Sequence, residues 1–383
     1  MFLERLIKFF ASLRLTVVCL GFGMVLIFTG TLAQVHLGLY KAQNEFFRSF
    51  FVYWQPEHFA WKIPVLPGGY LVGGILLLNL VAAHCERFSF SRKKAGIWMI
   101  HVGLIMLLVG QLLTDMLAVE SQLHLRVGDS RNYSESDREF ELAITDVTDK
   151  DADKVVAIPE HLLLKQGTIS HPQLPFTLKV AKFYANSAVT NHAAAGYEAS
   201  GASGGLGATG VWYKSMPRET VMNLRDLPSG LVEIVTPAGS AGTYMVSAFF
   251  GEPQKITVGS RTYTLMLRME RFYKPYSLRL LEFKHDVYKG TDVPKNFSSR
   301  IVLDRPATGE HRDVLIYMNN PLRYDGETYY QASFDEDDGG TILQVVHNPS
   351  WVTPYLACLL VGAGLITQFL SHLVPFLQRR RTV

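Results

Sequence analysis

The sequence predicts a polytopic α-helical membrane protein with four transmembrane helices and a large mainly-β extracytoplasmic domain inserted between helices 3 and 4. Three observations lead to this fold class. Of the 383 residues, 48% are hydrophobic, which is too apolar for an ordinary soluble domain. Four apolar runs are each long enough to cross a bilayer as one helix. Between the last two runs lies a long polar stretch with many short alternating segments, the pattern of β-strands separated by turns.

These patterns divide the chain into three parts. The N-terminal membrane part covers residues 1–117 and is expected to hold three helices, at about 12–33, 67–83 and 96–117. Residues 118–350 are expected to form one or two β-sandwich-like modules, and the glycine-rich segment 192–210 within them is expected to be a flexible loop. Residues 351–383 supply the fourth helix and a basic cytoplasmic tail.

Positive charges set the expected orientation, because loops rich in lysine and arginine stay on the cytoplasmic side. The loop after the first helix holds only Lys41, Arg48 and Lys62, whereas the other flanks are more basic. They carry Arg5, Lys8, Arg14, Arg87, Arg92, Lys93, Lys94, Arg379, Arg380 and Arg381. We therefore predict a multi-pass protein of the bacterial inner (plasma) membrane with cytoplasmic termini and a periplasmic large domain. The net charge of +3 gives no reason to expect a nucleic-acid partner.

Cysteine usage excludes two kinds of chemistry. Cys19, Cys85 and Cys358 all lie within or at the ends of apolar runs, so the polar domain has no disulfide framework. The chain has no C-x-x-C-H sequence and therefore does not itself hold a c-type haem covalently. It has no C-x-x-C either, which argues against a thiol–disulfide reductase.

The third apolar run, AGIWMIHVGLIMLLVGQLLTD, contains one titratable side chain within its apolar part, His101. A histidine in hydrocarbon is costly and needs a partner, a metal or a proton path. Gly96, Gly103 and Gly110 recur on the opposite helix face, where they would let another helix approach closely. Two interpretations of His101 stay open: a packed histidine bonded to a neighbouring helix, or an axial ligand of haem. Asp115 shares the His101 face, but about 20 Å further along the axis, and is expected to be a helix-end residue in water.

Three more histidines are weaker candidates for haem contacts. His84, at the exit of the second helix, and His372, near the cytoplasmic end of the fourth, are expected at the same inner side of the bilayer as His101. Each is either an interfacial residue that reaches water or a second ligand. His58 lies between Trp54 and Trp61 on the outer face, where a haem edge could stack. Its alternative is an ordinary interfacial position.

Several segments resemble the ResB family, also called CcsB, which are cytochrome c biogenesis proteins of the system II type. They are SLRLTVVCLGFGMVLIFTGTLAQ near the start, then FKHDVYKGTDVPKNFSSRIVL, IYMNNPLRYDGETYYQASFD and TILQVVHNPSWVTPY before the last helix. The combination N-x-P-L-x-Y-x-G-x-x-Y-Y-Q is the most specific of these motifs, and its strands are interpreted as structural core. PVLPGG and the Asn79–Leu80 pair resemble a subset of the family. Residues 150–260 show no match.

The resemblance implies a subunit that works with a membrane partner of the CcsA or ResC type. The pair would carry haem across the membrane and attach it to apocytochrome c, with thiol-reducing biogenesis factors as further partners. His101 matches the family position thought to be one axial ligand of a haem b in the membrane, the partner supplying the other. No Trp-rich segment of the partner type occurs here. The chain would therefore be a non-catalytic subunit of a haem lyase, the cytochrome c synthase.

Two alternatives remain open from the sequence. A membrane b-type haem electron carrier would pair His101 with His84 or His372 as two ligands from one chain. A haem-free protein would only anchor a β-domain that assists assembly. The presence of haem would distinguish the synthase subunit and the electron carrier from the haem-free anchor. Dependence on a partner would distinguish the synthase subunit from the electron carrier.

Overall fold

The computed structural model describes residues 2–56, 61–87, 94–149, 153–221, 224–290 and 294–381. The chain divides into two compact units, each described here by itself. Unit 1 comprises Met1–Val119, Thr220–Met222 and Asn348–Val383 and holds the long helices. Unit 2 comprises Glu120–Glu219 and Asn223–His347 and is mainly β.

Unit 1 confirms the prediction of four helices that are long and apolar enough to cross a membrane. They are α2 (Leu13–Leu37), α4 (Gly69–Arg87), α5 (Ala95–Leu117) and α7 (Thr353–Arg381). A short amphipathic helix, α1 (Phe2–Phe10), precedes them. The aromatic stretch between α2 and α4 was expected to be a loop, but it contains regular elements. They are α3 (Leu39–Ala42), the π-helix η1 (Gln43–Phe47) and the hairpin of β1 (Phe51–Trp54) and β2 (Ile63–Pro67).

Helix α4 is longer than its apolar run predicted. The sequence places the helix end at Ala83, with His84 at the exit, but the helix continues to Arg87. Glu86 and Arg87, the last two residues of this extension, are strong helix formers, which favours continuation of the helix after the apolar run. His84 is consequently a helical residue whose direction is fixed by α4.

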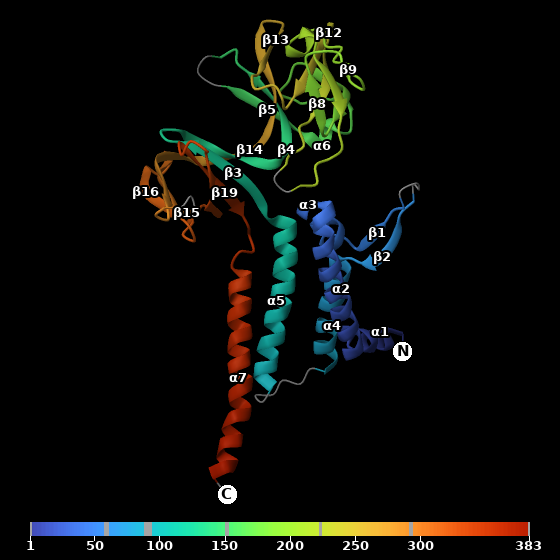
Figure 1. Cartoon of the computed structure of the whole chain (residues 1–383), viewed down its shortest axis with the longest axis vertical. Coiled ribbons are helices and arrows are strands. Elements are labelled where there is room, and N and C mark those ends of the chain that lie inside the picture. Colours follow the sequence, from blue (N-terminus) through green and yellow to red (C-terminus); the bar gives the residue numbers. More distant parts are fainter. Residues whose placement is uncertain are drawn as a thin grey trace. The chain divides into compact units, whose positions relative to one another are not determined.

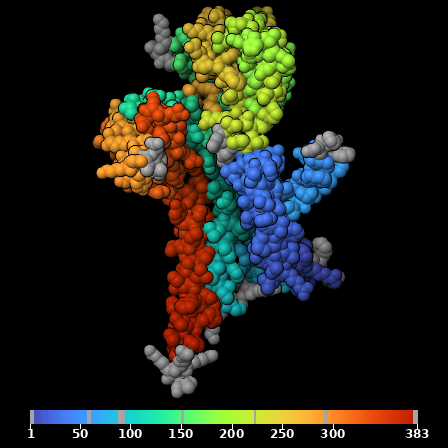
Figure 2. All heavy atoms as spheres, in the orientation of Figure 1, coloured from blue at the N-terminus to red at the C-terminus, as the bar shows by residue number. Residues whose placement is uncertain are grey.

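The glycine face of α5 packs against α7, as the sequence predicted (Figure 1). A Cβ added at Gly96 would lie 2.7 Å from the carbonyl oxygen of Gly364, and one at Gly103 would lie 2.5 Å from Cγ2 of Val361. Gly110 is equally close to the first turn of α7. In Figure 2 the red atoms of α7 lie directly against the teal atoms of α5. The glycines therefore set the close approach of these two helices, as small residues do between membrane helices.

A buried amide joins α4 to the N-terminal part of the bundle. Asn79 is 4% exposed; its Oδ1 accepts from the hydroxyl of Thr16 at 2.7 Å, and its Nδ2 donates to the carbonyl of Ser12 at 3.0 Å. Interhelical hydrogen bonds of this kind stabilise membrane bundles, because polar groups in the bilayer have no water with which to form hydrogen bonds. Asn79 is thus a structural contact between α2 and α4.

Unit 2 contains a β-sandwich, as predicted. One sheet has the strand order β5-β4-β14-β13 and the other has the order β12-β11-β7-β6. The strands are β4 (Ser130–Asp146), β5 (Lys154–Pro159), β6 (Gly167–Ile169), β7 (Thr177–Tyr184), β11 (Ser229–Thr236), β12 (Gly239–Ser247), β13 (Gln254–Val258) and β14 (Arg261–Val287). Their inward side chains, with those of α6 (Glu160–Leu163), form one apolar core.

A second module grows from the same two long strands. Beyond the sandwich, β14 and β4 continue into a curled sheet of order β16-β15-β14-β4-β3-β19-β18-β17. Its other strands are β3 (Val119–Arg126), β15 (Pro294–Arg305), β16 (Glu310–Tyr317), β17 (Leu322–Tyr324), β18 (Glu327–Phe334) and β19 (Gly340–His347). The sheet curls until β16 contacts β18 and encloses a separate core. We call this part the curled-sheet module.

The glycine-rich segment 192–210 is ordered, contrary to the prediction of a flexible loop. It contains β9 (Glu198–Ala199) and the 3-10 helix η3 (Leu206–Thr209), and it precedes β10 (Trp212–Ser215), which pairs with β8 (Ser187–Thr190) and β9. The buried Gly207 lies against Met245, where a Cβ would be 2.5 Å from the Met245 side chain. Small residues let this segment pack flat on the sandwich, which the low apolar content did not reveal.

Candidate functional site

The structure brings two of the candidate histidines together within unit 1. His84 of α4 and His101 of α5 face each other, with His101 Nδ1 and His84 Nε2 3.1 Å apart. Their rings are perpendicular, with centroids 4.7 Å apart. Trp98, one turn before His101, completes the cluster with its ring centroid 5.1 Å from that of His84. Both histidines are partly buried.

The hydrogen-bond chain fixes the tautomers of the neutral rings. His84 Nδ1 lies 2.7 Å from the carbonyl oxygen of Leu80, which can only accept, so His84 Nδ1 carries the proton and donates. His84 Nε2 is then an acceptor, and the proton that it receives must come from His101 Nδ1. His101 is left with an unprotonated Nε2. That nitrogen makes none of the hydrogen bonds found among the described residues.

This donor set fits a metal-bearing cofactor that takes one imidazole nitrogen from this chain. A ligating histidine usually donates its other ring N–H to an acceptor that fixes its tautomer and orientation. His84 fills that role for His101, and the Leu80 carbonyl fills it for His84. Within the described part of the chain, no three His, Cys, Asp or Glu side chains gather to hold a bare metal ion. His101 Nε2 is therefore suited to a cofactor such as haem, in which the macrocycle supplies most of the metal's ligands.

His84 and His101 are not arranged as two axial ligands of one haem. Opposed imidazole nitrogens on one metal would be about 4 Å apart, since each metal–nitrogen bond is about 2 Å, and the macrocycle would lie between them. Here the two rings are in direct contact through a 3.1 Å hydrogen bond. This geometry suits one ligand with a positioning residue better than two ligands of one haem.

The other two candidates do not join this cluster. His372 of α7 is exposed, and its Nε2 lies 2.8 Å from Nε2 of Gln368 one turn earlier. Among the described residues, no hydrogen bond or ring contact joins His372 to His84 or His101. His58 lies outside the described residues.

Asp115 was expected to be a helix-end residue in water, and this was wrong. Its side chain is only 9% exposed and pairs with Arg48, whose Nε lies 2.8 Å from Oδ1. The hydroxyl of Tyr70 donates to the same carboxylate. The close approach of Gly68 and Gly69 to the segment that carries Arg48 makes this possible, because a Cβ at either glycine would meet backbone oxygen at 2.3 Å. The two glycines of the PVLPGG sequence therefore allow the close backbone approach that brings Arg48 into contact with Asp115.

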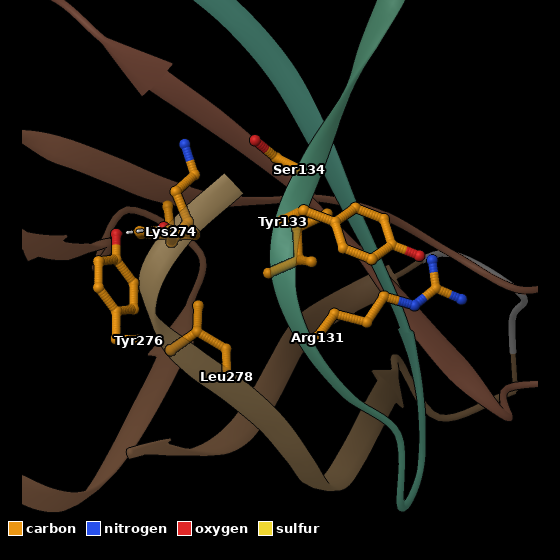
Figure 3. A pocket seen from close by; sticks show the side chains of 8 residues that line it. Arg131, Tyr133, Ser134, Lys274, Tyr276 and Leu278 are labelled. Atoms are coloured by element: carbon orange, nitrogen blue, oxygen red, sulfur yellow. Dashed lines mark hydrogen bonds between the residues drawn. The ribbon is translucent and has the colours of Figure 1, made fainter. Parts of the chain in front are cut away.

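Unit 2 contains a buried polar cluster at the point where the two long strands separate. The β14–β4 register shifts between Tyr273 and Leu278, and such a bulge redirects side chains. Lys274 and Tyr276 of the bulge line a small hollow together with Tyr133 and Ser134 of β4 (Figure 3). The bulge therefore opens a small hollow between β4 and β14.

One carboxylate in this cluster receives several hydrogen bonds. Glu327 Oε2 accepts from the hydroxyls of Tyr276 at 2.9 Å and Tyr329 at 2.7 Å, and Lys274 pairs with Oε1. Burial raises the pKa of both tyrosines well above the ordinary value. Tyr329 belongs to the N-x-P-L-x-Y-x-G-x-x-Y-Y-Q motif and is 1% exposed. The motif tyrosine is thus a core residue, in agreement with its structural interpretation.

The direct contact between His84 and His101 is the feature of the candidate site that the sequence alone did not specify. Sequence reasoning placed both residues at similar depth, but it ended the second helix too early to give His84 a direction. The helix propensity of the residues that follow the apolar run could have predicted that the helix continues to Arg87. Trp98 could have been found because it lies one turn from His101, on the same side of α5.

Within the described residues, unit 1 holds four helices apolar enough to cross a membrane, and unit 2 is a mainly-β domain of two modules. Residues 238–342, which run from β12 through β18 to the start of β19, match the ResB-like family. The resemblance to this family that the motifs predicted is confirmed over that segment. The chain is also 25% identical over 301 residues to Protein NrfI of Wolinella succinogenes. That alignment covers 78% of this chain but 30% of NrfI, so the chain spans less than a third of that relative.

Proposed function

We propose that this chain is a membrane subunit of a system II cytochrome c synthase. In this role it works in cytochrome c biogenesis, holds haem within the membrane and passes it toward attachment to apocytochrome c. The observation that carries the proposal is the hydrogen-bond chain from the Leu80 carbonyl through His84 to His101, which leaves His101 Nε2 ready to ligate iron. The ResB-like match and the similarity to NrfI support it independently.

His101 would supply one axial nitrogen, and a CcsA- or ResC-type partner the other. The contact between His84 and His101 supports a shared site, because His84 is occupied as a hydrogen-bond partner rather than as a second ligand. Bound haem would bring iron chemistry to a site that this chain builds from α4 and α5. The residues of this chain orient His101 and keep its Nε2 unprotonated through the contact with His84.

The orientation of the chain follows from its charges in the same proposal. The basic flanks would place the termini and the α4–α5 turn on the cytoplasmic side of the bacterial inner membrane. His84 and His101 lie at the end of the bundle nearest that turn. They would therefore receive haem from the cytoplasmic side, while unit 2 would lie in the periplasm near the apocytochrome.

Cytochrome maturation in cells tests this function. The chain would be produced with a CcsA-type partner and a secreted C-x-x-C-H apocytochrome in a bacterium without its own maturation system, and covalent haem would be detected by haem-stained gels. His101→Gly should abolish the product, and added imidazole should restore part of it by replacing the missing ligand. His372→Ala, a histidine exposed on α7, is the matched control and should mature normally.

Two outcomes would contradict the proposal. If His101→Gly matured cytochrome as well as wild type, His101 would not be a required ligand. If wild type gave no product with any CcsA-type partner but bound six-coordinate haem alone, the chain would be a b-type electron carrier instead. A His84→Ala variant should retain partial activity, because it removes the positioning residue and not the ligand.

A further inference from the structure

The hairpin of β1 and β2 in unit 1 exposes a large aromatic and aliphatic surface. Phe50, just before β1, is 63% exposed, and Tyr53 and Trp54 are 52% and 57% exposed. Val65 on β2 is also half-exposed. A two-stranded hairpin is at best marginally stable in water by itself, and a contiguous apolar surface of this kind marks contact with a partner or a membrane. The hairpin therefore needs a covering from outside the described part of the chain.

The root of the hairpin is attached to the start of α4. The amide of Gly68 donates to the carbonyl of Phe50 at 2.9 Å, and the amide of Tyr70 donates to the carbonyl of Ser49 at 3.1 Å. The rings of Phe50 and Tyr70 are in contact, with centroids 5.9 Å apart. Since α4 is a candidate membrane helix, these contacts hold the root at the level of its first turn.

A contact with α2 gives the depth of this root. A Cβ added at Gly30 would lie 2.9 Å from Cζ of Phe47, so the end of η1 packs directly on that position of α2. Gly30 precedes Leu37, the last residue of α2, by about 10 Å along the axis. The 25 residues of α2 span about 37 Å, whereas the hydrocarbon core of a bilayer is about 30 Å thick. The root follows Phe47 closely in the chain and thus lies near the boundary between hydrocarbon and headgroups.

The backbone of the hairpin is suited to the headgroup layer. From the root, the strands project sideways from the helices and rise toward the α3 end of the bundle (Figure 1). Each strand has an unpaired edge, because within the described residues β1 and β2 form a sheet of two. Open sheet edges are not tolerated in hydrocarbon, but in the headgroup layer water can satisfy them. The two-stranded form therefore favours the interface over the acyl core.

The side chains of the hairpin match the same layer. Tryptophan and tyrosine are enriched at membrane–water interfaces, because their rings are apolar and also carry a hydrogen-bonding group. Within the described residues 49–56 and 61–67, the charged side chain is Lys62, which is exposed and suits a lipid phosphate. On α2, Ile27 and Leu32, close to Gly30, are also exposed. The hairpin thus continues an apolar surface that a bilayer would cover.

We infer that the β1–β2 hairpin is an interfacial anchor, whose exposed aromatic side chains insert among phospholipid headgroups and the adjoining acyl chains. The leaflet concerned is the one at the α3 end of the bundle. The anchor fixes the depth of η1 and of the neighbouring Arg48–Asp115 ion pair in the bilayer. The inference concerns lipid contact and does not depend on haem or on the proposed function.

Photocrosslinking of the full chain in lipid nanodiscs tests the inference. The nanodiscs contain phosphatidylethanolamine and phosphatidylglycerol, and Tyr53→p-benzoylphenylalanine places a photoreactive ketone on the hairpin. This change leaves the core intact, because Tyr53 is half-exposed. After irradiation, mass spectrometry of the intact protein should show phospholipid adducts in at least tenfold higher yield than at a tyrosine in water.

Two exposed tyrosines are matched controls for the same replacement. Tyr273 of β14 is 55% exposed and lies in unit 2, so it should give only background lipid adduct. Tyr355, in the first turn of α7, is 63% exposed and belongs to a candidate membrane helix, so it should give a clear adduct. Val65→p-benzoylphenylalanine on β2 is a second probe of the hairpin, used together with circular dichroism in case the first variant fails to fold.

The outcomes identify what covers the hairpin. If the probes at Tyr53 and Val65 give no more phospholipid adduct than the probe at Tyr273, the hairpin faces water and the inference is wrong. If they crosslink to a co-produced CcsA-type partner or to a second copy of this chain in place of phospholipid, the surface is a protein interface and the inference is also overturned. The adducts should be unchanged in a His101→Gly background, so this test and that of the proposed function fail independently.

Discussion

The close packing of α5 on α7 allows a quantitative prediction. A Cβ at Gly103 would lie 2.5 Å from Cγ2 of Val361 and 2.9 Å from the carbonyl oxygen of Ala357. The second contact is with backbone, so a side-chain rotation cannot relieve it and the two helices must separate. Overpacking of this kind costs about 1–3 kcal/mol. The Gly103→Ala variant should therefore lose stability even though alanine favours a helix by about 1 kcal/mol over glycine.

Gly362→Ala isolates the steric part of this effect. Gly362 lies in α7, and a Cβ there would meet no atom within 4 Å, so only helix propensity changes. The difference between the two variants should be about 1–3 kcal/mol, with Gly103→Ala the less stable. Unfolding by SDS in mixed micelles, followed by circular dichroism, measures it. Equal stability of the two variants would refute the account of the glycine face.

Three further predictions concern the polar contacts. Tyr329→Phe removes a hydroxyl that donates to a buried carboxylate and should destabilise unit 2 by about 1–3 kcal/mol in a thermal melt; the half-exposed Tyr330→Phe is its control and should be near neutral. Burial and the neighbouring carboxylates of Glu139 and Glu141 raise the pKa of Glu270 above its ordinary 4.5. The folded protein therefore binds this proton more tightly than the unfolded chain does. As a result, the free energy of unfolding of wild type falls as the pH rises from the unfolded-state pKa to the folded-state pKa. Glu270→Gln should therefore be more stable than wild type at neutral pH and lose that advantage below about pH 4. Asp115→Asn removes the charge that pairs with Arg48, so limited proteolysis should cleave the segment before α4 faster than in wild type. Unchanged cleavage would count against the role of that ion pair.

The sequence was informative about the fold where one physical signal dominates. Apolar run length predicted the four candidate membrane helices, and the seven-residue glycine repeat predicted the face on which α5 meets α7. Alternation predicted a β-rich domain and a sandwich. The alternation pattern could not predict that β4 and β14 would each run through both modules. Alternation shows which face of a strand is buried, but it does not show against which hydrophobic core that face packs.

The candidate site was predicted less completely. His101 was identified because a histidine in an apolar run is costly, but its contact with His84 depends on where α4 ends and how α4 turns toward α5. The state of Asp115 depended on Arg48, which is distant in sequence and is brought near by the tight Gly68–Gly69 connection.

The absorption spectrum of the purified complex with a CcsA-type partner tests the central claim most directly. Wild type should show a Soret band from histidine-ligated haem, and the His372→Ala complex should show the same band. The His101→Ala complex should lose it. The His84→Ala complex should keep a weaker or shifted band, because His101 remains but is no longer oriented. An unchanged spectrum of the His101→Ala complex would contradict the claim that this chain ligates haem through His101.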